Sequence, residues 1–138
     1  MVDLCSLSVH AVSGTEGVDS IRLRALVKNQ VFLLLVDSGS SATFINSTFV
    51  QQAGLFPQPV STIRVKTASG QELVSTTMVK AVEWWCGGHT FTTDMRVLDL
   101  GPYDAILGCD WLKQNSPITC NWNQKSLGFS YQGSWVQL

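Results

Sequence analysis

The stretch "VFLLLVDSGSSATFI", Val31 to Ile45, places an aspartate directly after a run of apolar residues. The run Val31–Val36 does not alternate apolar and polar side chains, which predicts a central strand covered on both faces. A carboxylate at the end of such a strand is costly to bury unless hydrogen-bond donors surround it. The three serines and Gly39 that follow supply hydroxyl groups and a backbone free to turn. The stretch therefore predicts a strand that ends in a loop built to hold the carboxylate of Asp37.

Length and composition favour one compact domain. The chain has 138 residues, of which 45% are hydrophobic and 14% are charged, enough for one core and too few for two ordinary domains. A net charge of -1 and a pI near 6.0 give no electrostatic reason to expect nucleic acid or an anionic membrane as a partner. The longest apolar run, Val31–Val36, is far below the ~20 residues that span a bilayer. The N-terminus lacks the basic and apolar regions of a signal peptide, so a soluble chain in a reducing compartment is expected.

The residues that could ligate a metal do not form a recognisable site. They are Cys5, Cys86, Cys109, Cys120, His10 and His89. None of the usual zinc spacings occurs among them, and the histidines have no nearby nucleophile pattern that would suggest a Ser or Cys triad. We therefore expect reduced structural thiols and no metal or other cofactor.

Alternating and apolar segments predict many short strands. The first expected strands are Leu7–Val12 and Ile21–Val27, followed by a turn at residues 28–30 and the central strand. Asn46 or Ser47 is a candidate N-cap for a short helix that ends at Gly54.

Two hairpins are expected next, one around Ser69-Gly70 and one around Gly87-Gly88. A buried strand in "YDAILG" and a short helix in "CDWLKQN", with Asp110 as N-cap, follow. The last segment predicts a pair of strands around residues 123–125 and then a tail. The tryptophans expected in the core are Trp84, Trp85, Trp111 and Trp122. This pattern predicts an all-β, closed or partly closed barrel with one or two short helices.

Three motifs, taken in order, resemble those of the retropepsin-type aspartic proteases. The apolar strand followed by Asp37-Ser38-Gly39 resembles the catalytic segment, and "AILG" at Ala105–Gly108 resembles the second signature, which packs beside the catalytic loop. Between them, the hairpin "VKTASGQEL" lies where that family has its flap. The chain is most similar to the protease region of gypsy-type long-terminal-repeat retrotransposon polyproteins, particularly plant ones, through "LRALVKNQVFLLLVDSGSSATFIN" and "YDAILGCDWL". The likeness covers residues 21–129, so residues 1–20 are interpreted as an N-terminal extension with a first strand and residues 21–138 as the protease domain.

The resemblance implies a role for each matching residue. Asp37 would be the catalytic acid and base, with Ser38 bonding across two catalytic loops, Gly39 allowing the tight turn and Ser40 supporting the loop. The flap would consist of Lys66, Thr67, Ala68, Ser69, Gly70 and Gln71. The residues Ile106, Leu107 and Gly108 would be structural supports. Asp104 precedes them and is interpreted as a hydrogen-bonded or solvent-facing turn residue.

Hydrolysis by this class needs two carboxylates that share one proton around a water. The chain has a single Asp-Ser-Gly, so the family mechanism implies a homodimer in which the second Asp37 comes from the partner chain. The expected function is an aspartic endopeptidase that cleaves its own Gag-Pol-type polyprotein, in the cytoplasm or inside virus-like particles. Two alternatives stay open: a catalytically silent module of the same fold for dimerisation or peptide binding, and a small barrel for an unrelated ligand.

Overall fold

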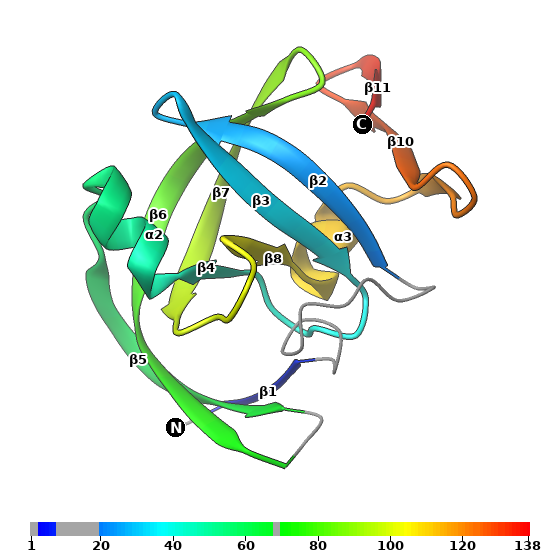
Figure 1. Ribbon diagram of the computed structural model, residues 1–138. Coiled ribbons are helices and arrows are strands. Elements are labelled where there is room, and N and C mark those ends of the chain that lie inside the picture. The colour runs from blue at the N-terminus through cyan, green and yellow to red at the C-terminus, as the bar shows by residue number, and fades with distance from the viewer. Residues whose placement is uncertain (1–2, 8–19, 68–69) are drawn as a thin grey trace.

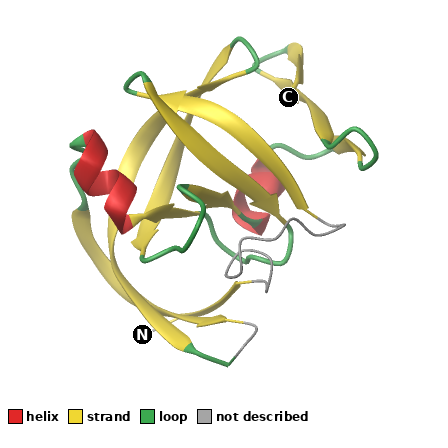
Figure 2. Ribbon diagram, viewed as in Figure 1, coloured by secondary structure: helices red, strands yellow, loops and turns green. Residues whose placement is uncertain are grey.

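The computed structural model describes residues 3–7, 20–67 and 70–138, and most of these lie in strands (Figures 1 and 2). In chain order the elements are β1 (Asp3–Leu7), β2 (Ser20–Val27), β3 (Gln30–Asp37), β4 (Phe44–Asn46), α2 (Ser47–Ala53), β5 (Gln58–Thr67), β6 (Glu72–Cys86), β7 (His89–Leu98), β8 (Ala105–Leu107), α3 (Cys109–Gln114), β9 (Ile118–Asn121), β10 (Ser126–Tyr131) and β11 (Ser134–Gln137). The expected strand Leu7–Val12 lies outside the described residues except for Leu7, which ends β1.

Six strands close into a barrel. Their order is β6-β2-β3-β8-β4-β7, and a further β6–β7 pairing joins the two ends of this series (Figure 1). In β2 the alternation predicted from the sequence holds, because Ile21, Leu23 and Ala25 are buried in the core while Arg22 and Arg24 face outward. The absence of a free edge within this ring explains how so short a chain forms a stable β structure.

The strand β6 runs without interruption from the hairpin into the barrel wall. The sequence predicted two separate strands in this region, one for each hairpin, and that prediction was wrong. The N-terminal half of β6 pairs with β5, and the C-terminal half pairs with β7 and with β2 at Trp85. The register shifts between Pro59 and Ile63 on one side and between Val79 and Val82 on the other. An irregular ladder of this kind bends a strand and lets it change partners.

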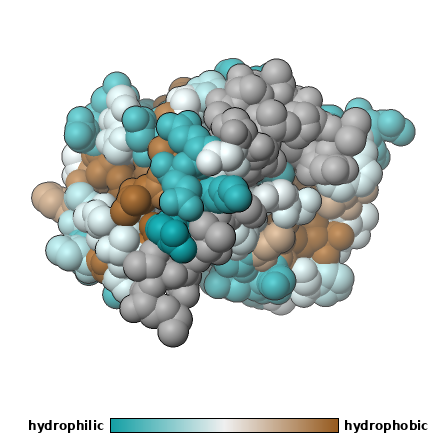
Figure 3. Space-filling view, turned by 90° about the horizontal axis from the view of Figure 1, so that it is seen from below, coloured by the Kyte–Doolittle hydropathy of each residue, from teal (hydrophilic) through white to brown (hydrophobic). Residues whose placement is uncertain are grey.

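A second apolar cluster connects the hairpin to the barrel. Ile63 and Val65 of β5 pack with Leu35 of β3 and Ile106 of β8, together with Tyr103 from the loop before β8. On its other edge, β5 pairs in parallel with β1. The hairpin is therefore anchored against the outer face of the strands that lead to Asp37. The surface seen from below, the side of the hairpin in Figure 1, mixes hydrophilic side chains with separate apolar patches (Figure 3).

The two short helices begin differently from each other. Helix α2 has the expected cap: Asn46 accepts a hydrogen bond from the Thr48 N–H at 3.2 Å, and Gly54 ends the helix with φ 66°. The N-cap of helix α3 is Gly108, which has no side chain that could cap it. The prediction that Asp110 is the N-cap was wrong, because Asp110 lies inside the first turn. No helix among the described residues is both long and apolar enough to cross a membrane.

The C-terminal residues form a separate three-stranded sheet in the order β11-β10-β9. The expected tail is thus a third strand, β11, and its residue Val136 is buried with Phe129 in the core. The prediction for the tryptophans was half right. Trp84 and Trp111 are buried, whereas Trp85 is 48% and Trp122 is 47% exposed. Aromatic side chains suit strands on either face, so β-propensity did not separate the two pairs.

Candidate active site

Asp37 is the last residue of β3 and is only 3% exposed. Its carboxylate accepts a hydrogen bond from the Gly39 N–H at 2.8 Å, and its carbonyl oxygen accepts one from the Ser40 N–H at 3.1 Å. The backbone of Ser20, at the start of β2, pairs with Asp37 from the neighbouring strand. The loop thus turns directly after the strand and directs the Gly39 N–H at the carboxylate.

The Ala105–Gly108 motif lies against this loop. Val36 pairs in parallel with Leu107, and both Ile106 and Leu107 are completely buried. A side chain at Gly108 would collide with the carbonyl oxygen of Ala42 and lie 2.7 Å from that of Ser40. Glycine is therefore required at this position because the loop backbone passes where a Cβ would be.

Helix α3 holds the loop through its first residue. The Cys109 N–H donates to the Ser40 carbonyl oxygen at 2.8 Å, and the Cys109 thiol donates to the Ser38 carbonyl oxygen at 3.0 Å. Ser38 itself is exposed. Ser40 supports the loop through its backbone, because its buried hydroxyl oxygen has no hydrogen-bond partner among the described residues.

A hydrogen-bond network that the sequence did not reveal closes the far end of the loop. The Thr43 hydroxyl donates to Asp110 Oδ1 at 2.6 Å, and the Thr43 N–H donates to Asp110 Oδ2 at 3.2 Å. The same hydroxyl oxygen accepts a hydrogen bond from the Gly108 N–H at 3.1 Å. Because Asp110 was interpreted as a cap, its real partner 67 residues earlier was missed. The one available signal was a small hydroxyl residue at the end of the Asp37 loop.

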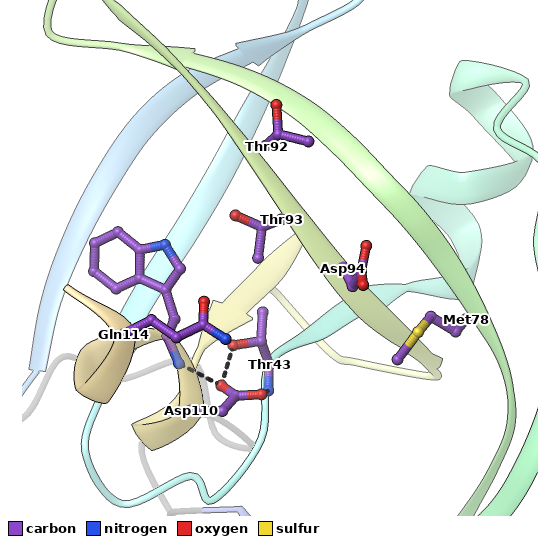
Figure 4. Close-up of a pocket in the computed structure, with 8 residues that line it drawn as sticks. Thr43, Met78, Thr92, Thr93, Asp94, Asp110 and Gln114 are labelled. Carbon is purple, nitrogen blue, oxygen red and sulfur yellow. Dashed lines mark hydrogen bonds between the residues drawn. The ribbon is translucent and has the colours of Figure 1, made fainter. Parts of the chain in front are cut away.

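Figure 4 shows Thr43 and Asp110 on the wall of a cavity of about 260 Å³. The cavity is also lined by Met78 of β6, by Asp94 of β7 and by Gln114 of α3. Asp37 does not line this cavity. Among the described residues, no group of three or more His, Cys, Asp or Glu side chains could hold a metal ion.

The hairpin between β5 and β6 carries the predicted flap residues. The Thr67 N–H donates to the Gln71 carbonyl oxygen at 2.8 Å, and Gly70 adopts a left-handed conformation with φ 90°. Lys66 ends the ladder with Glu72. Ala68 and Ser69 lie outside the described residues. The described residues on either side of positions 68 and 69 therefore pair with each other as the two arms of a hairpin.

Asp104 has the role of a hydrogen-bonded turn residue. Its carboxylate accepts a hydrogen bond from the Leu33 N–H at 2.7 Å, and its own N–H donates to the Leu33 carbonyl oxygen at 2.9 Å. Its carbonyl oxygen accepts a bond from the Asn46 N–H at 2.8 Å. Asp104 thus links the start of β8 to β3 and β4, and it helps to hold β3, the strand that ends at Asp37.

Comparison with known proteins places this geometry in a protease family. The model of the PEG10/RTL1 protease domain matches residues 33–134 of the 138. A search of curated proteins found no match. Among solved structures, the retroviral protease-like domain of Ddi1 from Leishmania major is similar, with a TM-score of 0.63 and 16% identity over 88% of this chain and 96% of that one. A retropepsin-like aspartic protease from Rickettsia conorii has a TM-score of 0.50 and 15% identity over 74% and 76% of the two chains. The expected retropepsin-like barrel is confirmed.

Proposed function

The chain belongs to the PEG10/RTL1 protease domain family, and from this premise we propose that it is an aspartic endopeptidase with Asp37 as its catalytic residue. The observation that carries the proposal is the buried carboxylate of Asp37 at the end of β3, bonded to the Gly39 N–H. Here the loop is fixed from both sides, by β2 through Ser20 and by α3 through Cys109. Fixed geometry is what a catalytic carboxylate needs.

The proposed chemistry uses two copies of Asp37. One carboxylate takes a proton from a water that attacks the scissile carbonyl, and the other, protonated, donates a hydrogen bond to the carbonyl oxygen. Since the chain has one Asp-Ser-Gly, the second carboxylate comes from a second copy of the chain across a two-fold axis. Ser38 is exposed beside Asp37 and is available to bond to the partner loop, in line with the role that the sequence motif implies.

The proposed substrate is an extended peptide segment of a polyprotein that contains this domain, of the gypsy-type retrotransposon class. The hairpin Lys66–Gln71 would close over it as a flap, with the peptide added as a strand. The apolar surroundings of Asp37 favour hydrophobic residues on both sides of the cleaved bond. The proposed location is the cytoplasm or the interior of virus-like particles. Because the two carboxylates share one proton, activity is expected from acidic to near neutral pH.

The test is cleavage of the flanking polyprotein by the wild type and by Asp37→Asn over a range of protein concentrations, with sedimentation in parallel. Asp99→Asn, a change at an exposed aspartate, is the matched control. We expect the wild type and the control to cleave with a rate that rises more steeply than first order at low concentration. Asp37→Asn should fold and dimerise without cleaving. A folded wild-type dimer that cleaves nothing would instead identify a silent binding module, and equal cleavage by Asp37→Asn would refute the role of Asp37.

A further inference from the structure

The outer edge of β5 is a sheet edge of the hairpin on which a peptide could add as a strand, and residues 3–7 pair with it. The strand β6 pairs with β5 and then with β2 along one edge and with β7 along the other, because Met78 pairs with both Gln58 and Arg96, and Trp85 pairs with both β2 and β7. The inner edge of β5 is paired with β6, so its outer edge is the remaining one. There β1 pairs in parallel with Ile63–Thr67, in register from Asp3 to Leu7.

This edge belongs to the part of the hairpin nearest the Asp37 strand. The backbones of Ile63 and Val65 pair with β1. The side chains of these two residues pack with Leu35 of β3 and Ile106 of β8. Leu35 lies two positions before Asp37 on β3. Ala42, in the loop after Asp37, packs against the same apolar cluster. A strand that adds to this edge of β5 therefore runs beside the site.

The direction of β1 also relates it to the site. Because β1 is parallel to β5, it runs toward the hairpin turn and ends with Leu7 opposite Thr67. The next described residue, Ser20, pairs with Asp37. The described strands on either side of residues 8–19 therefore end opposite Thr67 and begin opposite Asp37.

We propose that β1 is an intramolecular occupant of the position that an extended peptide takes on the hairpin, and that it must leave this edge before a peptide binds. The expected consequence, inhibition of peptide cleavage by β1, rests on the proposed function. Its physical basis is competition for one row of backbone donors and acceptors. A five-residue parallel edge strand has few backbone hydrogen bonds compared with the barrel strands, so it can open locally without unfolding the domain.

The variant that tests the proposal is Leu4→Pro/Cys5→Pro in the full chain. Successive residues of a strand direct their N–H groups to opposite sides, so one of the two prolines removes a donor that faces β5. The matched control is Leu4→Val/Cys5→Val, which keeps both N–H groups. Deletion of residues 1–7 is a second variant, which removes β1 without introducing proline and so separates the loss of β1 from other effects of the two prolines. Amide hydrogen exchange measured at β3 reports whether each protein is folded.

The first readout is amide exchange at Ile63–Thr67. We expect protection there in the wild type and the valine control, and faster exchange in the proline and deletion variants, with β3 unchanged. Equal exchange in all four proteins would overturn the proposal, because β1 would then not hold the edge.

The second readout is binding of a labelled synthetic peptide, Asp-Leu-Cys-Ser-Leu with blocked ends, to the same proteins carrying Asp37→Asn. We expect affinity for the proline and deletion variants to exceed that of the wild type by about tenfold or more, because an occupied edge lowers apparent affinity by the fraction of open molecules. Equal affinities would overturn the proposal.

Cleavage gives the third readout, and it separates the two proposals. With Asp37 restored, the proline variant should cleave the flanking polyprotein faster than the valine control at equal dimer concentration. If no form cleaves, the proposed function fails, while the peptide affinities still decide whether β1 occupies the edge. If all forms cleave at the same rate, β1 does not inhibit and the inference fails.

Discussion

The Asp110 carboxylate accepts hydrogen bonds from both the hydroxyl and the N–H of Thr43, at 2.6 and 3.2 Å, and so joins α3 to the end of the Asp37 loop. The same hydroxyl oxygen accepts the Gly108 N–H. The loop is therefore fixed at its start by β2, in its middle by Cys109 and at its end by Asp110.

Thr43→Val should destabilise the domain more than Thr43→Ser. Valine fills nearly the same space but removes both the donor to Asp110 and the acceptor of the Gly108 N–H, leaving polar groups unpaired at a cost of about 1–3 kcal/mol. Serine keeps the hydroxyl. Urea unfolding of the three proteins measures the difference, and equal losses for the two variants would show that packing matters rather than the hydroxyl.

Gly108→Ala should be among the most damaging single-methyl changes in the chain. Its Cβ would collide with the Ala42 carbonyl oxygen and approach that of Ser40, and overpacking of this kind costs about 1–3 kcal/mol or more. The matched change is Gly88→Ala, where nothing lies within 4 Å and only the backbone conformation at φ 84° is strained. Thermal unfolding should rank Gly108→Ala clearly below Gly88→Ala, with cleavage reduced as well. The opposite ranking would mean that the loop yields easily.

Asn46→Asp should lower the free energy of unfolding by about 3 kcal/mol although it preserves the cap of α2. The Asn46 side chain is buried and its amide donates to the carbonyl oxygens of Leu100 and Tyr103 at 2.8 and 3.2 Å, so a carboxylate would face two acceptors. The control is Asn121→Asp, at an exposed turn where the side-chain oxygen is already the acceptor, for the Gln124 N–H. Urea titration should find Asn121→Asp close to the wild type, and a similar loss in both variants would contradict the assigned amide orientation.

Alkaline pH should reduce stability through Cys86. Burial raises the pKa of the Cys86 thiol, so the folded state keeps the proton at a pH where the unfolded chain loses it. The resulting stabilisation is complete below the ordinary thiol pKa of about 8.5 and is lost as pH rises through the higher folded value. Urea unfolding under reducing conditions should therefore show a steeper decline above about pH 8.5 for the wild type than for Cys86→Ala. Parallel declines would indicate that other groups titrate instead.

The sequence predicted well where one segment determines its own structure. The apolar run before Asp37, the Asn46 and Gly54 helix boundaries and the tight turns could be predicted because local chemistry specifies them. It failed where a distant partner decides. Aspartate is a common N-cap residue, but the side chain of Asp110 bonds to Thr43, which is distant in the sequence. The continuity of β6 depends on two neighbouring strands that pair with it in different registers. Exposure of Trp85 likewise depends on which face of β6 points outward.

The uninterrupted strand β6 makes the hairpin and the barrel wall parts of one ribbon. Met78 pairs with Gln58 on the hairpin side and with Arg96 on the barrel side, and the register irregularities lie on either side of it. Ala81, at one of them, has φ 54°, a conformation rare for a residue with a side chain. Within the described residues, no loop interrupts β6 between the hairpin and the barrel wall, so the hairpin cannot move without bending or twisting this strand. A movement of the hairpin would twist β6 near residues 78–82, where its pairing is irregular. A substitution among these residues would therefore change the stiffness of the hairpin, although they are remote in the chain from both its turn and Asp37.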